Sequence, residues 1–102
     1  MELIVRHKGT RVRFEVVGII DEKGAEVLRQ DFSKLDTGAI SELVLDLGNV
    51  GYICSAGVGK LLMFYRELTE NGGKLLVEND TGSVRELLVA SKMDTILCSA
   101  NN

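Results

Sequence analysis

The chain has 102 residues, of which 45% are hydrophobic and 26% are charged, and its net charge is −3. This length and composition predict one soluble domain, residues 1–102, with a single core. The acidic balance argues against nucleic acid as the main ligand, because phosphate binding requires a basic surface. The start is charged too soon for a signal peptide, and no apolar run is long enough to insert in a membrane. We therefore expect a cytoplasmic protein.

The cysteine and histidine content gives no metal or cofactor site. Cys54 and Cys98 are far apart and form no Cys-x-x-Cys motif, and the only histidine is His7. One histidine and two cysteines at this spacing do not make a metal site, so no metal or cofactor is expected. Both thiols are expected to be reduced in a cytoplasm.

The first third of the chain predicts two strands and a helix. Residues 2–7 and 10–17 predict a β-hairpin, because apolar residues alternate with charged ones in the second segment and Gly9-Thr10 suits a turn. A helix begins near Asp21 and ends around residues 36–38, where Gly38 is a plausible C-cap. One face of that helix carries Ala25, Leu28, Phe32 and Leu35.

The remainder of the chain alternates strands and helices. Residues 43–47, apolar on both faces, are typical of a central strand in a sheet covered by helices. A helix over 56–70, with Met63 and Phe64 widening its apolar face, leads to a strand over 74–78 that we expect to lie parallel to 43–47. A third helix opens at Ser83, whose spacing to Glu86 suits a capping box, and Thr95–Leu97 is a last short strand.

This order is β-β-α-β-α-β-α-β. Such alternation predicts a single α/β domain with a mixed, mostly parallel central sheet and right-handed crossovers.

A Gly-rich stretch over 50–59 joins the central strand to the second helix and places Ser55 at the helix start. One interpretation is that Ser55 is an ordinary N-cap, a position for which serine is preferred. The other is that Ser55 is modified, because a helix start accommodates a phosphate with its unpaired N–H groups and dipole. The local pattern alone favours the cap.

Patterns for catalysis are incomplete. Gly57-Val58-Gly59-Lys60 resembles part of a P-loop, but the earlier glycine is replaced by Cys54 and the following Ser or Thr by Leu61. A catalytic Ser or Cys requires a base, and His7 is expected on a distant hairpin. We therefore expect that the protein is not an enzyme.

The run from Leu43 to Val58 resembles the motif of the STAS domain family, as found in bacterial anti-sigma factor antagonists. The family motif is a strand ending in Leu-Asp-Leu, a short loop, and Asp-Ser-Ser-Gly-Leu/Val opening a helix. Residues 18–21 and 74–88 resemble flanking parts of the family in the right order. The resemblance covers nearly the whole chain and implies a STAS-like fold.

The resemblance also implies a function. Members of this family bind an anti-sigma factor that is also a serine kinase, and phosphorylation of the motif serine ends the complex until a serine phosphatase resets it. That serine corresponds to Ser55, and Asp21 corresponds to an acidic residue beside the loop. The implied partner-binding residues are Asp21, Tyr52, Ile53, Cys54, Ser55, Ala56, Gly57 and Val58. With the resemblance included, a regulated Ser55 is favoured over a cap.

Two positions depart from the family motif and leave alternatives open. Cys54 replaces the aspartate before the serine, and Ala56 replaces the second serine. One alternative is a STAS subunit that docks constitutively in a transporter or a stress-signalling complex without phosphorylation. Another is a thiol sensor that uses Cys54, because a helix N-terminus can lower a thiol pKa.

Overall fold

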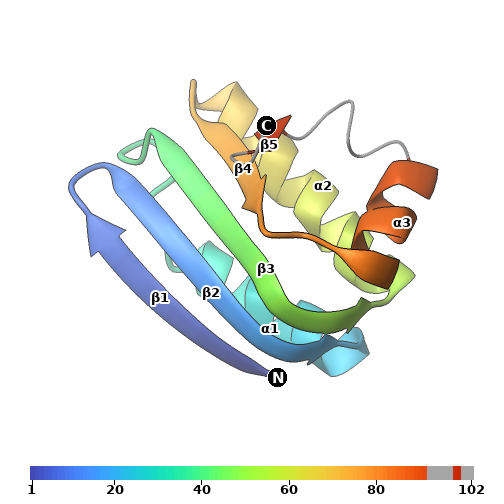
Figure 1. The fold of residues 1–102 in the computed structure, drawn as a ribbon. Helices are drawn as coiled ribbons and strands as arrows, with labels where there is room; N and C mark the ends of the chain where they lie inside the picture. The colour runs from blue at the N-terminus through green and yellow to red at the C-terminus, as the bar shows by residue number, and fades with distance from the viewer. Residues whose placement is uncertain (92–97, 100–102) are drawn as a thin grey trace.

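The computed structural model describes residues 1–91 and 98–99 and has the α/β fold and element order expected from the sequence (Figure 1). The strands are β1 (Glu2–Lys8), β2 (Arg11–Ile20), β3 (Glu42–Ile53), β4 (Lys74–Glu78) and β5 (Cys98–Ser99). The helices are α1 (Glu22–Ser33), α2 (Ser55–Glu70) and α3 (Gly82–Ala90). The last strand expected at Thr95–Leu97 lies outside the described residues.

The strands form one sheet in the order β1-β2-β3-β4-β5. The hairpin β1–β2 is antiparallel and turns at Gly9, whose φ of 61° suits glycine. All other neighbouring strands are parallel. The prediction that residues 43–47 and 74–78 are adjacent parallel strands is confirmed, because Leu43 pairs with Leu75 and Leu45 with Val77.

The two faces of the sheet differ in what covers them. Inward-pointing residues of β2, β3 and β4 are buried against α1 and α2, which lie behind the sheet in Figure 1. Phe32 of α1 stacks on Phe64 of α2, with ring centroids 4.2 Å apart. On the opposite face Val44 and Leu76 are only half-buried. The helices expected over the sheet therefore cover one of its faces, and the second apolar face of the central strand is only partly buried.

Strand β3 is longer than the sequence predicts, because residues 48–53 continue the strand rather than forming a turn. Its register against β2 shifts twice, so that Glu15 pairs with Asp46 but Val17 with Asn49, and Gly18 pairs with Val50 but Ile19 with Tyr52. Each shift inserts one extra residue in β3. Gly48 and Gly51 lie at these shifts, and glycine inside a strand commonly marks a bulge.

Several helix ends and faces also differ from the expectations. Helix α1 ends at Ser33 with Lys34 as C-cap, so Gly38 is not its cap. Helix α3 has Thr81 as N-cap with no side-chain hydrogen bond, so the capping box at Ser83 does not form. The side chain of Met63 is 45% exposed and lies outside the core.

Candidate functional site

The candidate site lies where β2 and β3 end side by side and α1 and α2 begin. Ile20 and Ile53 are register partners, and both are buried. The backbone N–H of Cys54 donates to the carbonyl of Ile20, 2.9 Å away. These contacts bring the first turns of both helices to one end of the sheet, with Asp21 and Ser55 on neighbouring connections.

Each helix is capped by the residue that directly precedes it. Asp21 Oδ1 accepts a hydrogen bond of 2.8 Å from the N–H of Gly24, and Cys54 Sγ accepts a longer one of 3.4 Å from the N–H of Gly57. Cys54, and not Ser55, is therefore the N-cap of α2. The interpretation of Ser55 as a cap is wrong by one position.

Ser55 is the first residue of α2, and it is exposed. Within the part of the chain that the structure describes, no side-chain hydrogen bond involves its hydroxyl. The first turn of a helix has unpaired N–H groups and the positive end of the helix dipole. The hydroxyl is thus available to another protein, and a phosphate on it would meet a favourable local field.

The first turn of α2 is packed closely on the strand ends through Gly57. A Cβ atom at Gly57 would lie 2.8 Å from Ile53 Cγ1 and 2.9 Å from Ile20 Cγ2. Both isoleucines are buried and β-branched, so they have little room to move. The absent side chain lets the helix start, and with it Ser55, sit directly over the ends of β2 and β3.

An exposed apolar pair lies near the ends of the same two strands, β2 and β3. Tyr52 and Ile19 are register partners, and each is 50% exposed. Tyr52 was among the partner-binding residues implied by the sequence, but Ile19 was not. The signal for Ile19 was the alternation of buried and exposed residues along β2, which continues to buried Ile20, but the strand predicted over 10–17 ended before Ile19.

The other implied partner-binding residues divide by exposure. Ala56 is exposed, and Asp21 and Cys54 are partly exposed, so all three are accessible beside Ser55. Ile53, Gly57 and Val58 are buried in the core. These three support the surface from below, and their side chains are not available for contact.

A contact from α3 holds the end of β3 in place. The hydroxyl of Ser83 donates to the carbonyl of Gly51, 3.1 Å away, in the residue before Tyr52. This serine had been assigned to a capping box, whereas its hydroxyl serves the extended strand. Sequence spacing gave no signal for this contact, because 32 residues separate the two partners.

Comparison with known proteins identifies the family of this chain. A family model described as "Mlab, STAS domain" matches residues 3–98. The chain belongs to the STAS domain family. This match confirms the family that the run from Leu43 to Val58 resembles.

Solved structures similar to this STAS domain share its fold. An anti-sigma factor antagonist from Mycobacterium paratuberculosis aligns with a TM-score of 0.86 and 22% identity, covering 99% of this chain and 86% of that one. The Bacillus cell fate determinant SpoIIAA in its phosphorylated form aligns with a TM-score of 0.78 and 21% identity over 97% and 91% of the two chains. SpoIIAA in its unphosphorylated form aligns with a TM-score of 0.75 and 20% identity, covering 86% of this chain and 82% of that one.

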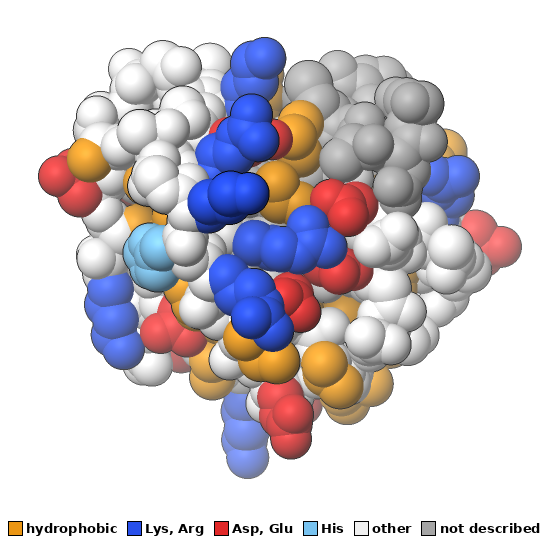
Figure 2. Space-filling view, turned by 60° about the vertical axis from the view of Figure 1, so that its left-hand side comes forward, with side chains coloured by type: hydrophobic (Ala, Val, Ile, Leu, Met, Phe, Trp, Pro, Cys, Tyr) orange, Lys and Arg blue, Asp and Glu red, His pale blue; other side chains and the backbone are white. Residues whose placement is uncertain are grey.

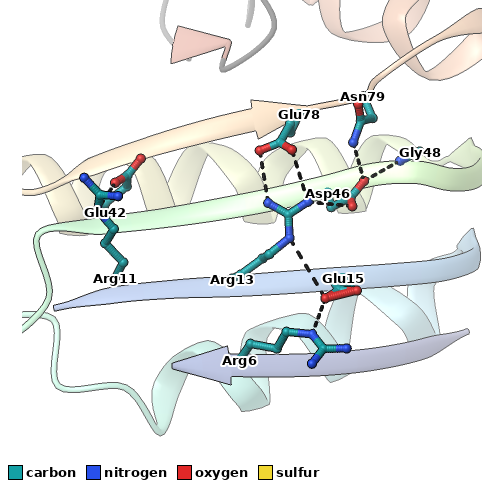
Figure 3. Close-up of polar contacts among 9 residues, drawn as sticks. All are labelled: Arg6, Arg11, Arg13, Glu15, Glu42, Asp46, Gly48, Glu78 and Asn79. Atoms are coloured by element: carbon teal, nitrogen blue, oxygen red, sulfur yellow. Dashed lines mark hydrogen bonds and ion pairs between the residues drawn. The ribbon is translucent and has the colours of Figure 1, made fainter. Parts of the chain in front are cut away.

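The STAS domain carries a second polar feature, an ion-pair cluster on the open face of the sheet (Figure 3). Arg13 donates to both carboxylate oxygens of Glu78, at 3.0 and 3.1 Å, and to Asp46 at 2.7 Å. Asp46 also accepts from Asn79 and from the N–H of Gly48, each at 3.0 Å. Arg6 pairs with Glu15 at the edge.

This cluster shifts two pKa values. The hydrogen bond to Glu78 raises the pKa of Arg13 above its usual value. Burial opposes this shift, and the hydrogen bond to Asp46 adds to it. Burial alone would raise the pKa of Asp46, but hydrogen bonds from Asn79, Gly48 and Arg13 outweigh it and lower that pKa below 3.8. The cluster therefore stays ionised and joins β2, β3 and β4 across the uncovered face.

Residues 1–91 and 98–99 lack two further features. No group of three or more His, Cys, Asp or Glu side chains lies together in a way that could hold a metal ion. In that same part of the chain, no helix has both the length and the apolar character to cross a membrane.

Proposed function

We propose that this STAS domain is a non-catalytic cytoplasmic binding module that docks an anti-sigma factor with serine-kinase activity. The partner would contact Tyr52, Ile19 and the first turn of α2, and phosphorylation of Ser55 would release it. A serine phosphatase would reverse the modification. The family and the similarity to anti-sigma factor antagonists support this direction.

The observation that carries the proposal is the position of Ser55. Its hydroxyl is exposed at the first position of α2 and makes no hydrogen bond to the described residues, three positions after Tyr52, which with its register partner Ile19 is half-exposed at the strand ends. A serine that only served the fold would direct its hydroxyl to a backbone group, as Ser83 does. An unused hydroxyl next to exposed apolar side chains suits a docking surface that a kinase can reach.

The proposed switch is electrostatic. A phosphate adds about −1.5 to −2 charge at pH 7 and is compatible with the start of a helix, so the fold is expected to change little. A partner packed on Tyr52 and Ile19 would have to bury that charge without a counter-ion. A loss of about 1.4 kcal/mol in binding is tenfold in affinity, and a few such increments release the partner.

The test is to measure partner affinity and thermal stability for wild type, Ser55→Ala and Ser55→Asp, with the partner obtained by co-purification from the native host. Both variants should be nearly as stable as wild type, because Ser55 is not the cap. Ser55→Ala should bind and resist inactivation by the kinase. Ser55→Asp should bind at least about tenfold more weakly.

Ser33→Asp is the matched control. It adds the same charge at the far end of α1, roughly 18 Å along a 12-residue helix from the site. Its affinity should equal that of wild type. Equal affinity for all variants would contradict the switch and favour constitutive docking, the alternative left open by Cys54.

A further inference from the structure

The open face of the sheet is hollowed at the end opposite to Ser55. A groove of about 700 Å³ crosses β1 to β4 near the hairpin turn, over residues 6–13, 42–44 and 76–78. Figure 2 shows Lys and Arg side chains gathered in a band over one face of the molecule, with hydrophobic side chains between them. From Arg11 to Ile20 the strand β2 spans roughly 30 Å, so this groove is separate from the candidate site.

The groove is basic in an acidic protein. Its lining includes four cations, Arg6, Lys8, Arg11 and Arg13, and two carboxylates, Glu42 and Glu78. The whole chain has a net charge of −3, so the remaining surface is more acidic than the total indicates. Charge separation of this kind directs an anionic partner to one face.

The cations differ in how much they are engaged within the fold. Arg13 is held by Glu78 and Asp46 and has only 32% of its side chain exposed. Arg11 pairs with Glu42 at 3.1 Å, yet 72% of its side chain is exposed, and Arg6 is 63% exposed beside Glu15. Lys8 makes no ion pair with any described residue. Lys8, Arg11 and Arg6 can therefore still meet external carboxylates.

The floor of the groove is apolar. Val44 of β3 and Leu76 of β4 are register partners, and both are half-buried below the charged side chains. An apolar floor between cationic rims fits a chain that offers both carboxylates and an apolar side chain. A flat membrane surface would reach the rims but not a recessed floor, since membrane-binding faces present their apolar side chains outward.

The dimensions suit an extended peptide. Four strands at about 4.8 Å spacing give a path of roughly 14 Å, which an extended segment covers with about four residues. We propose that this groove binds a short acidic segment of a partner protein, with carboxylates at Lys8, Arg11 and Arg6 and an apolar side chain on Val44 and Leu76. This second docking surface goes beyond the proposed function and does not depend on Ser55.

The test measures binding of the full chain to a fluorescein-labelled peptide in which Glu and Leu alternate, with fluorescence anisotropy as the readout. A peptide with Lys in place of Glu is the charge control. We expect saturable binding of the acidic peptide only, weakened by added salt. The variant Lys8→Glu/Arg11→Glu should bind at least about tenfold more weakly. Both side chains line the groove, and Arg11 is 72% exposed despite its ion pair with Glu42.

The matched control is Lys23→Glu/Arg66→Glu, which makes the same charge change at exposed positions of α1 and α2. It should alter affinity by less than about twofold, as exposed charges outside a contact usually do. Leu76→Ser should weaken binding without changing its salt dependence. Equal weakening by both double variants, or equal binding of the two peptides, would overturn the proposal. Binding to anionic vesicles in place of the acidic peptide would also overturn it.

Discussion

At the scale of single residues, two glycines in one helix should respond in opposite ways to alanine. A Cβ at Gly57 would meet the buried Ile53 and Ile20 at 2.8 and 2.9 Å, whereas one at Gly59 has nothing within 4 Å. Gly57→Ala should lower the free energy of unfolding by about 1–3 kcal/mol through overpacking. Gly59→Ala should raise it by about 0.5–1 kcal/mol. Urea unfolding of both variants measures this, and a stabilised Gly57→Ala would show that the helix start is loosely packed.

The capping role of Cys54 in α2 can be tested by comparison with Asp21, which caps α1 in the same way. The Asp21 carboxylate caps α1 at 2.8 Å, but the Cys54 sulfur, a weak acceptor, caps α2 at 3.4 Å. Cys54→Asp should therefore stabilise the protein by about 0.5–1 kcal/mol. Cys54→Ala is the control and should not stabilise. Thermal denaturation decides between them, and an Asp variant no more stable than the Ala variant would contradict the capping role.

The same position shows how far the sequence can place a site. The motif located Ser55 at the start of α2, which is where the helix begins in the structure. The assignment of the cap failed by one residue, because serine is a preferred cap and cysteine is not. Backbone pairing decided the outcome, since the N–H of Cys54 is fixed to Ile20 and its side chain is thereby directed at Gly57.

At the scale of elements, strand β3 shows why boundaries were harder to predict than order. The sequence predicts that the strand stops at residue 47 and that a Gly-rich stretch over 50–59 leads to the helix, but Gly48 and Gly51 both lie within a strand that is bulged against β2. A bulge and a turn use the same residue types, and only the neighbouring strand distinguishes them. The parallel pairing of 43–47 with 74–78 was predictable because it follows from two apolar strands joined by a helix.

The cluster around Asp46 gives β3 a pH dependence. The pKa of Asp46 in the folded protein lies below the ordinary value of 3.8. Its ionised carboxylate therefore stabilises the folded protein above pH 3.8, and this contribution is lost as the pH falls through the lower pKa of the folded state. Near neutral pH, Asp46→Asn should cost about 1–2 kcal/mol through weakened hydrogen bonds to Arg13 and Gly48. Urea unfolding at several pH values should show the difference from wild type shrinking in acid.

Glu26→Gln is the control for this prediction. Its pKa is also lowered, by Arg29, but that pair lies on the exposed surface of α1. Exposed pairs contribute little, so this variant should follow the wild-type pH profile closely. A constant difference between wild type and Asp46→Asn down to strongly acidic pH would show that ionisation of Asp46 does not support the fold.

At the scale of the whole molecule, the two layers separate the proposed functions in space. Helices α1 and α2 cover one face and present their N-termini with Ser55 at one end of the strands. On the other face, none of the helices within residues 1–91 lies over the centre, and the Arg13 cluster and the basic groove occupy it. Because the two surfaces share only the strands between them, a phosphate at Ser55 should leave peptide binding in the groove unchanged.

This two-layer arrangement predicts unequal effects for leucines on opposite faces of the sheet. Leu45 is 0% exposed against the helices, whereas Leu76 on the next strand is half-buried on the open face. Leu45→Ala should cost about 2–5 kcal/mol, through lost transfer energy and a cavity that its neighbours cannot fill. Leu76→Ala should cost less than about 2 kcal/mol, because water already reaches part of its side chain. Chemical denaturation of both variants compares the faces directly. Equal losses would mean that the open face is covered in solution, and a loss below about 1 kcal/mol at Leu45 would place it outside the core.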